Sequence, residues 1–490
     1  MRHPARRQGR KERLCSGSLL HGESLAHLQP NPKESRVLLR SVGVATFHTR
    51  GNYAPVADEI DAAGLEFTGS IPATLRGRYL RNGPNPLSGD ARHWFGGDGM
   101  LHEVRVDDDG ASYRNRLVRT PWTVDPTLPK VGDDGRPDLT RSLANTSVIG
   151  FAGATLALEE NSLPYRVDEQ LGTIGPWDMG GRLRTAMSAH PKVCPVTGEL
   201  HFIGYAAVEP YLTYHYADAS GLLVHSAPIS VPGPTMIHDM GLTTGHVVLL
   251  DLPVVMNRMT RRQPSFAWSD SYGARLGLLP RGGADGDVRW FEIEPCYIFH
   301  IANCFEREGV DGTEVVMDAV RFPELWREGS QRFAPPSMLW RYVLDCSTGR
   351  AREFALDDRS IEFPRIDDRR TGSAARWAYA VSTLDSPLAA IVRYDLLGGT
   401  APVVHQLESG RVLGEPVFVP DSPDAPEDDG WLVALAYDAT RDTSDLMVYA
   451  ACDVGDGPVA AVHLPRRVPH GFHGTWMPHR VSPLETESDR

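Results

Sequence analysis

One segment decides the fold: residues 342–349, which read YVLDCSTG. A β-prone run is followed by Asp and a Gly-containing turn, and this order is typical of a tight antiparallel hairpin. The same layout recurs at residues 214–221 (YHYADASG) and 392–399 (VRYDLLGG), and in a looser form at 447–455 (MVYAACDVG). The pattern therefore predicts a chain built from many short hairpins.

The spacing of these hairpins predicts a repeat architecture. Asp345, Asp395 and Asp453 follow one another at intervals of roughly 50 to 60 residues. Repeats of about this length with several strands each are typical of β-propellers, and roughly 440 residues would hold seven or eight of them. We therefore expect one closed all-β domain over residues 49–490, although a length of 490 residues alone suggests about three domains. A pair of β-sandwiches is the alternative.

Charge separates the first 48 residues from the rest. The chain carries a net charge of −13, yet residues 1–48 hold nine Lys or Arg and three Glu, which leaves −19 for the remainder. An acidic body excludes a surface that follows nucleic-acid phosphates. We expect residues 1–48 to be a disordered basic leader or a misassigned translation start. The six cysteines contain no CxxC pair, which favours a reducing compartment and predicts a cytoplasmic location.

Two longer stretches without the hairpin pattern, residues 121–145 and 255–285, are expected to be irregular or helical. In a propeller such insertions gather on one face and cover the axial opening. We therefore expect a helical and loop dome over a sheltered site on the axis.

Four of the 18 histidines lie in or directly after apolar stretches, where a neutral imidazole needs a partner. They are His190, His238, His300 and His473. The first two intervals between them correspond to about one repeat each, and the third corresponds to about three repeats. If the blades begin at one axis, these side chains can converge on a single metal ion. The alternative is four unrelated, hydrogen-bonded histidines.

Five short motifs follow one another along the chain. They are GRYLRNGPNP at residues 77–86, WFGGDGMLH at 94–102, EFPRID at 362–367, GEPVFVP at 414–420 and GFHG at 471–474. This ordered set resembles the carotenoid cleavage oxygenase family, which includes apocarotenoid oxygenases, lignostilbene dioxygenases and the vertebrate retinoid isomerohydrolase. The resemblance runs from Gly51 almost to the C-terminus.

The resemblance implies a seven-bladed β-propeller closed around an axial metal site, with a helical dome. It implies one iron(II) per chain, and four imidazoles suit such a divalent first-row metal. The implied ligands, which are also the catalytic residues, are His190, His238, His300 and His473. Three carboxylates are implied to accept hydrogen bonds from the far ring nitrogens and so to orient the imidazoles. These are Glu160, favoured over its neighbour Glu159, together with Glu362 and Glu415. Thr146 matches a threonine whose methyl group shields one open metal position.

The resemblance also implies the reaction. An iron(II)-dependent dioxygenase uses molecular oxygen to cleave one conjugated carbon–carbon double bond of a carotenoid or apocarotenoid into two carbonyl products. The protein would supply the metal and an apolar tunnel that fixes the position of one double bond. Aromatic side chains are the candidates for the tunnel lining: Phe95, Trp122, Trp268, Tyr272, Phe299 and Trp476.

Three alternatives stay open. Stilbenoid cleavage is the first, in a branch that binds a phenol with a Tyr and a Lys. Phe95 stands where that Tyr would be, and Lys130 is the lysine nearest the dome in the sequence. Isomerohydrolase chemistry uses the same metal residues, and a non-catalytic propeller that only binds a lipophile is the third.

The expected partners follow from the substrate. A lipophilic polyene or stilbenoid is the expected ligand, the expected oligomeric state is a monomer, and nucleic acid is excluded. Residues 255–285 are the candidate for peripheral membrane contact, because apolar side chains lie beside arginines there. The side chains concerned are Met256, Met259, Phe266 and Trp268 with Arg258, Arg261 and Arg262.

Overall fold

A computed structural model describes residues 49–87, 93–133, 136–259, 264–310, 312–327, 336–382 and 389–479, with only the backbone described at 257–259 and 264. The chain divides into two compact units, Met1–Val44 and Ala45–Arg490. The described residues all belong to the second unit. The predicted leader, residues 1–48, lies outside them.

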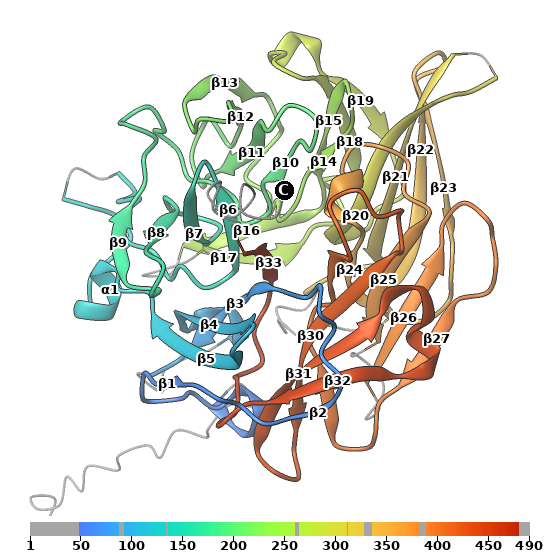
Figure 1. Ribbon diagram of the computed structural model, residues 1–490. Coiled ribbons are helices and arrows are strands. Elements are labelled where there is room, and N and C mark those ends of the chain that lie inside the picture. Colours follow the sequence, from blue (N-terminus) through green and yellow to red (C-terminus); the bar gives the residue numbers. More distant parts are fainter. Residues whose placement is uncertain are drawn as a thin grey trace, which may run out of the picture. The chain divides into compact units, whose positions relative to one another are not determined.

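Seven antiparallel sheets account for most of the second unit, and they are numbered here as blades 1–7 (Figure 1). Blade 1 holds β1 (Asp61–Ala62), β3 (Gly77–Asn85), β4 (Asp98–Asp107), β5 (Gly110–Leu117) and β33 (Gly474–Pro478). Blade 2 holds β6 (Ser147–Phe151), β7 (Ala154–Leu158), β8 (Tyr165–Val167) and β9 (Thr173–Pro176). Blade 3 holds β10 (Lys192–Val193), β11 (Leu200–Tyr205), β12 (Leu212–Ala217) and β13 (Leu223–Ile229). Blade 4 holds β14 (Gly241–Leu242), β15 (His246–Asp251), β18 (Arg275–Pro280) and β19 (Arg289–Glu292).

The remaining three blades complete the series. Blade 5 holds β20 (Tyr297–Glu308), β21 (Thr313–Phe322), β22 (Met338–Asp345) and β23 (Arg350–Ala355). Blade 6 holds β24 (Glu362–Arg365), β25 (Trp377–Ser382), β26 (Ala390–Asp395) and β27 (Val403–Gln406). Blade 7 holds β2 (Phe67–Gly69), β28 (Arg411–Leu413), β29 (Val417–Pro420), β30 (Gly430–Asp438), β31 (Thr443–Ala450) and β32 (Pro458–His463). The predicted seven-bladed β-propeller is thus confirmed, and the pair of sandwiches is excluded.

Both ends of the described chain close the ring. Near the C-terminus, β33 adds to β3 in blade 1, with Gly77 opposite Pro478 and Arg81 opposite Gly474. Near the N-terminus, β2 adds to β32 in blade 7. The last strand therefore lies beside one of the first (Figure 1). Two such pairings leave only short, protected sheet edges, which is how propellers solve the edge problem.

The predicted hairpins form where the Asp–Gly pattern is tight. Asp218, Asp345 and Asp395 end β12, β22 and β26 or directly follow them, and each carboxylate accepts a backbone hydrogen bond from two or three residues later. These Asx turns reverse the chain into the next strand. Asp453 differs, because it lies in the 3₁₀ helix η6 (Ala451–Asp456) rather than in a tight turn.

The predicted dome is only in small part helical. Residues 121–145 begin with a single helical turn, α1 (Pro121–Val124), and continue as irregular chain. The helical expectation for residues 255–285 is wrong, because β16 (Val254–Met259) pairs with β17 (Pro264–Trp268) before β18 begins. Val254 opposite Trp268 is the β-branched and aromatic kind of pair that stabilises a hairpin.

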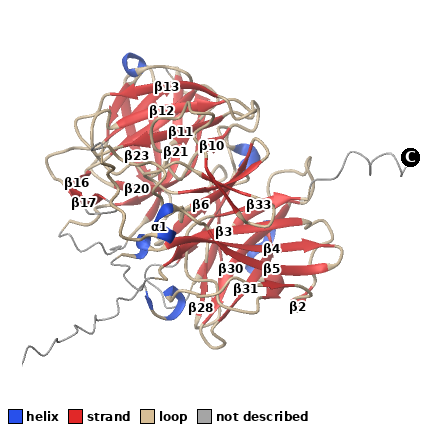
Figure 2. Ribbon diagram, turned by 90° about the vertical axis from the view of Figure 1, so that its left-hand side faces the viewer, coloured by secondary structure: helices blue, strands red, loops and turns tan. Residues whose placement is uncertain are grey.

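Helices are few elsewhere too (Figure 2). The other described helices are 3₁₀ turns: η2 (Gly51–Tyr53), η3 (Trp94–Gly96), η4 (Asp285–Asp287) and η5 (Asp368–Arg370). Among the described helices, none has the length and apolar content that would let it cross a membrane.

The core lies between neighbouring blades. The largest cluster includes residues of blades 3 to 6, and smaller clusters pack blade 6 on blade 7 and blade 7 on blade 1. β21 shows why such strands form: eight of its ten residues are buried, and Val, Met and Phe dominate them. Strands covered on both faces need apolar residues at consecutive positions, and this rigid packing fixes where each blade meets the axis.

Candidate metal centre

The predicted ligands lie at or near the beginning of a strand that forms one edge of its blade: β10, β14, β20 or β33. His190 precedes β10 by two residues and His238 precedes β14 by three. His300 is the fourth residue of β20, and His473 directly precedes β33. These edge strands contact those of neighbouring blades, as β14 does with β20 and β33 with β6. Four blades therefore deliver one imidazole each to a common place.

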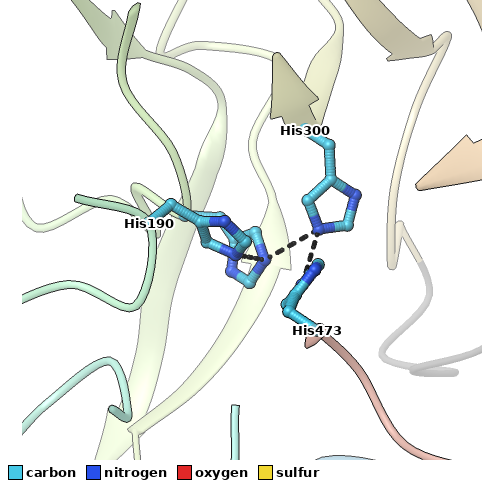
Figure 3. A group of neighbouring side chains, drawn as sticks. His190, His300 and His473 are labelled. Carbon is cyan, nitrogen blue, oxygen red and sulfur yellow. Dashed lines mark hydrogen bonds between the residues drawn. The ribbon is translucent and has the colours of Figure 1, made fainter. Parts of the chain in front are cut away.

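The four imidazoles meet at their Nε2 atoms. The Nε2–Nε2 separations are 2.9 Å from His190 to His238, 3.3 Å from His238 to His300 and 3.2 Å from His300 to His473. One nitrogen from each ring lies within 4.8 Å of all the others. His190, His300 and His473 point toward one spot from different segments of the chain (Figure 3).

Three carboxylates back these rings, and they come from the three blades that give no ligand. Glu160 lies just after β7, Glu362 begins β24, and Glu415 lies just before β29. The contacts are Glu160 Oε1 to His238 Nδ1 at 2.9 Å, Glu362 Oε2 to His300 Nδ1 at 2.5 Å and Glu415 Oε1 to His473 Nδ1 at 3.0 Å. Each of the seven blades thus contributes one of these seven side chains.

The carboxylates are themselves held in place. Glu415 Oε2 accepts a hydrogen bond from the Gly474 backbone N–H at 2.8 Å and lies 3.3 Å from Arg365 Nη1. Glu362 Oε2 accepts the Phe363 N–H at 2.7 Å. A carboxylate fixed in this way holds the tautomer and the orientation of the imidazole that it contacts.

Electrostatics favour neutral donors at two of the four positions. Burial holds the pKa of His190 well below its usual range, and the other imidazoles lower it further. Burial also lowers the pKa of His473 to about 4. At His300 burial lowers the pKa, but Glu362 outweighs it and the net shift is upward. For Glu415, burial alone would raise the pKa, but Arg365 and His473 bring it down to about 2.

The donor set fits a divalent first-row metal ion. Nitrogen ligands about 2.1 Å from such an ion and at right angles to one another lie about 3 Å apart, close to the separations between successive rings. Metal ligands must be deprotonated to bind, and the lowered pKa values of His190 and His473 meet that need. The carboxylates that contact the far ring nitrogens add negative charge without occupying a ligand position.

Thr146 lies next to the same site. It directly precedes β6, is 7% exposed, and its backbone carbonyl accepts the His473 N–H at 3.2 Å. Its hydroxyl donates to Asn145 Oδ1 at 3.1 Å. The sequence favoured Glu160 over its neighbour Glu159, and the structure puts Glu160 beside His238.

The predicted tunnel aromatics divide into two sets. Phe299 lies 5.2 Å from the His238 ring and 6.5 Å from the Phe95 ring, centroid to centroid, so both lie near the ligands. The other four have contacts with residues other than the four histidines. Trp122 donates to the Leu128 carbonyl, Trp268 to Asp270, Tyr272 to Asp251, and Trp476 packs on the core between blades 7 and 1.

Several residues at the site escaped the sequence reasoning. Phe363 packs 5.4 Å from both the His300 and the His473 rings, and its φ of +55° is unusual for a bulky residue. Trp326 and Phe472 join Phe95 and Phe299 in one aromatic group. Phe363 and Phe472 adjoin Glu362 and His473 in the sequence, and that adjacency was the available signal.

Comparisons with known proteins place this geometry in a family. The profile of the family called retinal pigment epithelial membrane protein matches residues 53–478. A carotenoid cleavage oxygenase of Mycobacterium tuberculosis is 36% identical over 88% of this chain and 97% of its own.

Solved structures agree with the sequence comparisons. A lignostilbene dioxygenase of Pseudomonas brassicacearum has a TM-score of 0.80 at 28% identity, covering 89% of this chain and 99% of that one. A variant of the Synechocystis apocarotenoid oxygenase has a TM-score of 0.78 at 26% identity, covering 87% and 98%. A cobalt-substituted form of that oxygenase has also been crystallised. The chain therefore belongs to the carotenoid cleavage oxygenase family and is an oxygenase that acts on a single substrate.

Proposed function

We propose that this protein is an iron(II)-dependent dioxygenase that cleaves a conjugated carbon–carbon double bond of a carotenoid or apocarotenoid into two carbonyl products. One observation carries the choice of substrate: the aromatic group beside the ligands, Phe95, Phe299, Trp326 and Phe472, is three phenyl rings and one indole, and none of them carries a hydroxyl or charged group. A polyene has no polar group at its reacting double bond, so an apolar surface suits it.

The geometry of the aromatic group supports this proposal. Phe95 lies 5.4 Å from Phe472 and 6.3 Å from Trp326, and Phe299 lies 6.2 Å from Trp326, centroid to centroid. Phe299 and Phe472 are both buried. Rings packed at these distances are rigid, so they can hold a linear substrate at one register while excluding water.

Within this proposal the four histidines hold iron(II), which when bound supplies the redox chemistry with molecular oxygen. The chain's own residues do the rest. Glu160, Glu362 and Glu415 orient the imidazoles. The hydroxyl of Thr146 is taken up by Asn145, which supports a role for its methyl group in covering part of the metal's open side.

Stilbenoid cleavage is the second candidate, and two observations favour it. The lignostilbene dioxygenase has a TM-score of 0.80, and Lys130 is a buried lysine near the predicted dome. However, Lys130 Nζ donates to the Arg141 carbonyl at 2.6 Å and lies 5.4 Å from the Trp122 ring. Phe95 also carries no hydroxyl group with which to bind a phenol. We therefore rank this candidate second.

A direct comparison of substrates tests the ranking. Purified iron-loaded protein is incubated in parallel with an apocarotenal and with a hydroxystilbene, and the aldehydes are separated by chromatography. Aldehydes from the apocarotenal, with oxygen-18 from labelled oxygen gas in both products, are expected. Products from the stilbene alone would refute our first choice.

We also propose a cytoplasmic monomer that contacts membranes through residues 255–285. Phe266 is buried and Trp268 packs on the core, so the proposal rests on the arginines of this stretch. Arg261 and Arg262 lie outside the described residues, as do the side chains of Arg258 and Met259. Cosedimentation with vesicles that contain anionic lipid tests this, with Arg261→Glu/Arg262→Glu expected to remain in the supernatant.

A further inference from the structure

One buried carboxylate next to the centre belongs to none of the ligand pairs. Asp239 follows His238 and is 1% exposed. Its Oδ1 lies 2.8 Å from Lys192 Nζ and accepts the Met240 N–H at 2.7 Å. Its Oδ2 accepts the Ile301 N–H at 2.8 Å. Both oxygens are therefore fully engaged.

These contacts reach three ligand segments from three blades. Lys192 lies two residues after His190 in blade 3, Met240 lies two residues after His238 before blade 4, and Ile301 follows His300 in blade 5. A single carboxylate thus joins the backbones or side chains that immediately follow three of the four ligands.

His190 gains the most from this arrangement. Within the described part of the chain it makes no hydrogen bond to a carboxylate, whereas each of the other three ligands has one beside its Nδ1. Its segment is held on one side by the Ser147 hydroxyl, which donates to the Ala189 carbonyl at 2.5 Å. On the other side the charged contact is that of Lys192 with Asp239.

We propose that Asp239 and Lys192 are a positioning pair that fixes the His190 segment against those of His238 and His300. The other three ligands each have a carboxylate at the ring. Among the described residues, His190 instead has this ion pair beside its chain segment. The inference rests on the proposed metal function, because its consequence is the geometry of the bound ion. Outer contacts of this kind govern metal affinity even though they touch no metal.

The structure offers a matched control. Arg275 and Asp251 form a second pair in blade 4, also 2.8 Å apart, with side-chain exposures of 24% and 1% against 21% and 1% for Lys192 and Asp239. Asp251 contacts Tyr272 and Arg275 but no ligand segment. Loss of either cation leaves a buried carboxylate unpaired, so both losses should lower stability. Only the loss of Lys192 should affect the metal.

The test uses cobalt(II) as the probe. Full-length apoprotein is titrated with cobalt(II) against a competing chelator, and the d–d absorption bands report the ligand geometry. We expect Lys192→Met and Lys192→Gln to bind cobalt(II) about 10- to 100-fold more weakly than wild type, with altered bands. Lys192→Arg should restore both. Arg275→Met should match Lys192→Met in its loss of thermal stability and match wild type in affinity and bands.

The outcomes separate the two proposals. Wild-type affinity and bands in both Lys192→Met and Lys192→Gln would overturn the positioning role. So would an equal loss of affinity in Arg275→Met, because it would show a general effect of destabilisation. A wild-type protein that binds no cobalt(II) would instead overturn the proposed metal function, and this inference with it.

Discussion

The two sides of the metal centre are built differently. On the His473 side, Glu415 contacts the ring directly, and Arg365 and the Gly474 N–H hold Glu415. On the His190 side, the described residues offer the ring no carboxylate, and the contacts hold the backbone segment instead. The His473 imidazole is oriented by a contact to the ring itself, whereas the His190 imidazole is oriented through contacts to its chain segment.

The two sides also differ in how the chain forms their blades. His473 stands beside the closing strand, so its position depends on pairing between the two ends of the described chain. His190 precedes a blade whose four strands are consecutive in the chain. Strand order alone does not set the carboxylate contacts, because His300 also belongs to a blade of four consecutive strands and has Glu362 beside its ring.

The largest expected effect comes from removing a ligand that lies between His473 and His238. His300 Nε2 lies 3.3 Å from His238 and 3.2 Å from His473. His300→Ala should lose metal affinity by more than the roughly 10- to 100-fold that loss of an outer contact causes. Metal content after aerobic purification measures this. His405→Ala is the control, because His405 lies in β27 of blade 6 and is not one of the four clustered histidines. Wild-type occupancy in His300→Ala would show that the ligand assignment is wrong.

The next effect compares the carboxylates. Glu415→Gln should lower metal affinity about 100-fold and Glu160→Gln about tenfold. The reason is that Glu415 also contacts Gly474 and Arg365, whereas the ion pair of Glu160 is with His238. Chelator competition with cobalt(II) measures both. Glu427→Gln controls for charge, because Glu427 accepts the Trp377 N–H and pairs with Arg370. Equal losses would mean that the anchoring of Glu415 adds nothing.

A backbone contact on the His473 side should matter for stability. A Cβ atom at Gly471 would lie 2.8 Å from Gly83 Cα, so the segment that carries His473 fits against β3 only without a side chain. Gly471→Ala should lower the free energy of unfolding by about 1–3 kcal/mol. Guanidinium titration of the apoprotein measures this. Gly286→Ala, where a Cβ meets nothing within 4 Å, is the control.

Acid should reduce the contribution that Glu415, on the His473 side, makes to the free energy of unfolding. Its pKa of about 2 lies below the ordinary value of 4.5, so the native state binds fewer protons there than the unfolded state. The resulting stabilisation is fully present above about pH 4.5 and is lost as the pH falls toward 2. The difference in unfolding free energy between wild type and Glu415→Gln should therefore shrink over that range. A constant difference would contradict it.

The smallest effect should come from removing residues 1–48, which belong to neither side of the metal centre. Both sides of the centre lie within residues 49–479, so removal of residues 1–48 should leave metal affinity and cleavage rate unchanged. Assays of the truncated and full-length proteins, prepared together, check this. A large loss of either would show that the N-terminal segment is part of the working enzyme.

Much of the centre was readable in the sequence. The Asp–Gly hairpins at a spacing of roughly 50 to 60 residues predicted a propeller, because a repeated turn fixes a repeated local structure. His190, His238, His300 and His473 stood out by the same spacing. The resemblance then pointed to Glu160, Glu362 and Glu415, and the structure brings all seven together.

The sequence by itself determined the hairpins of the blades and the histidines that stand near four of their strands. It could do so because hairpins and apolar strands are local properties. Only the tertiary structure decided which residues meet. Glu160 of blade 2 reaches past blade 3 to His238, and Asp239 joins three blades. Trp476 faces a core rather than the site, and the first part of the 255–285 stretch belongs to the β16–β17 hairpin. Such contacts depend on how seven twisted sheets close around one axis, and no local pattern encodes that closure.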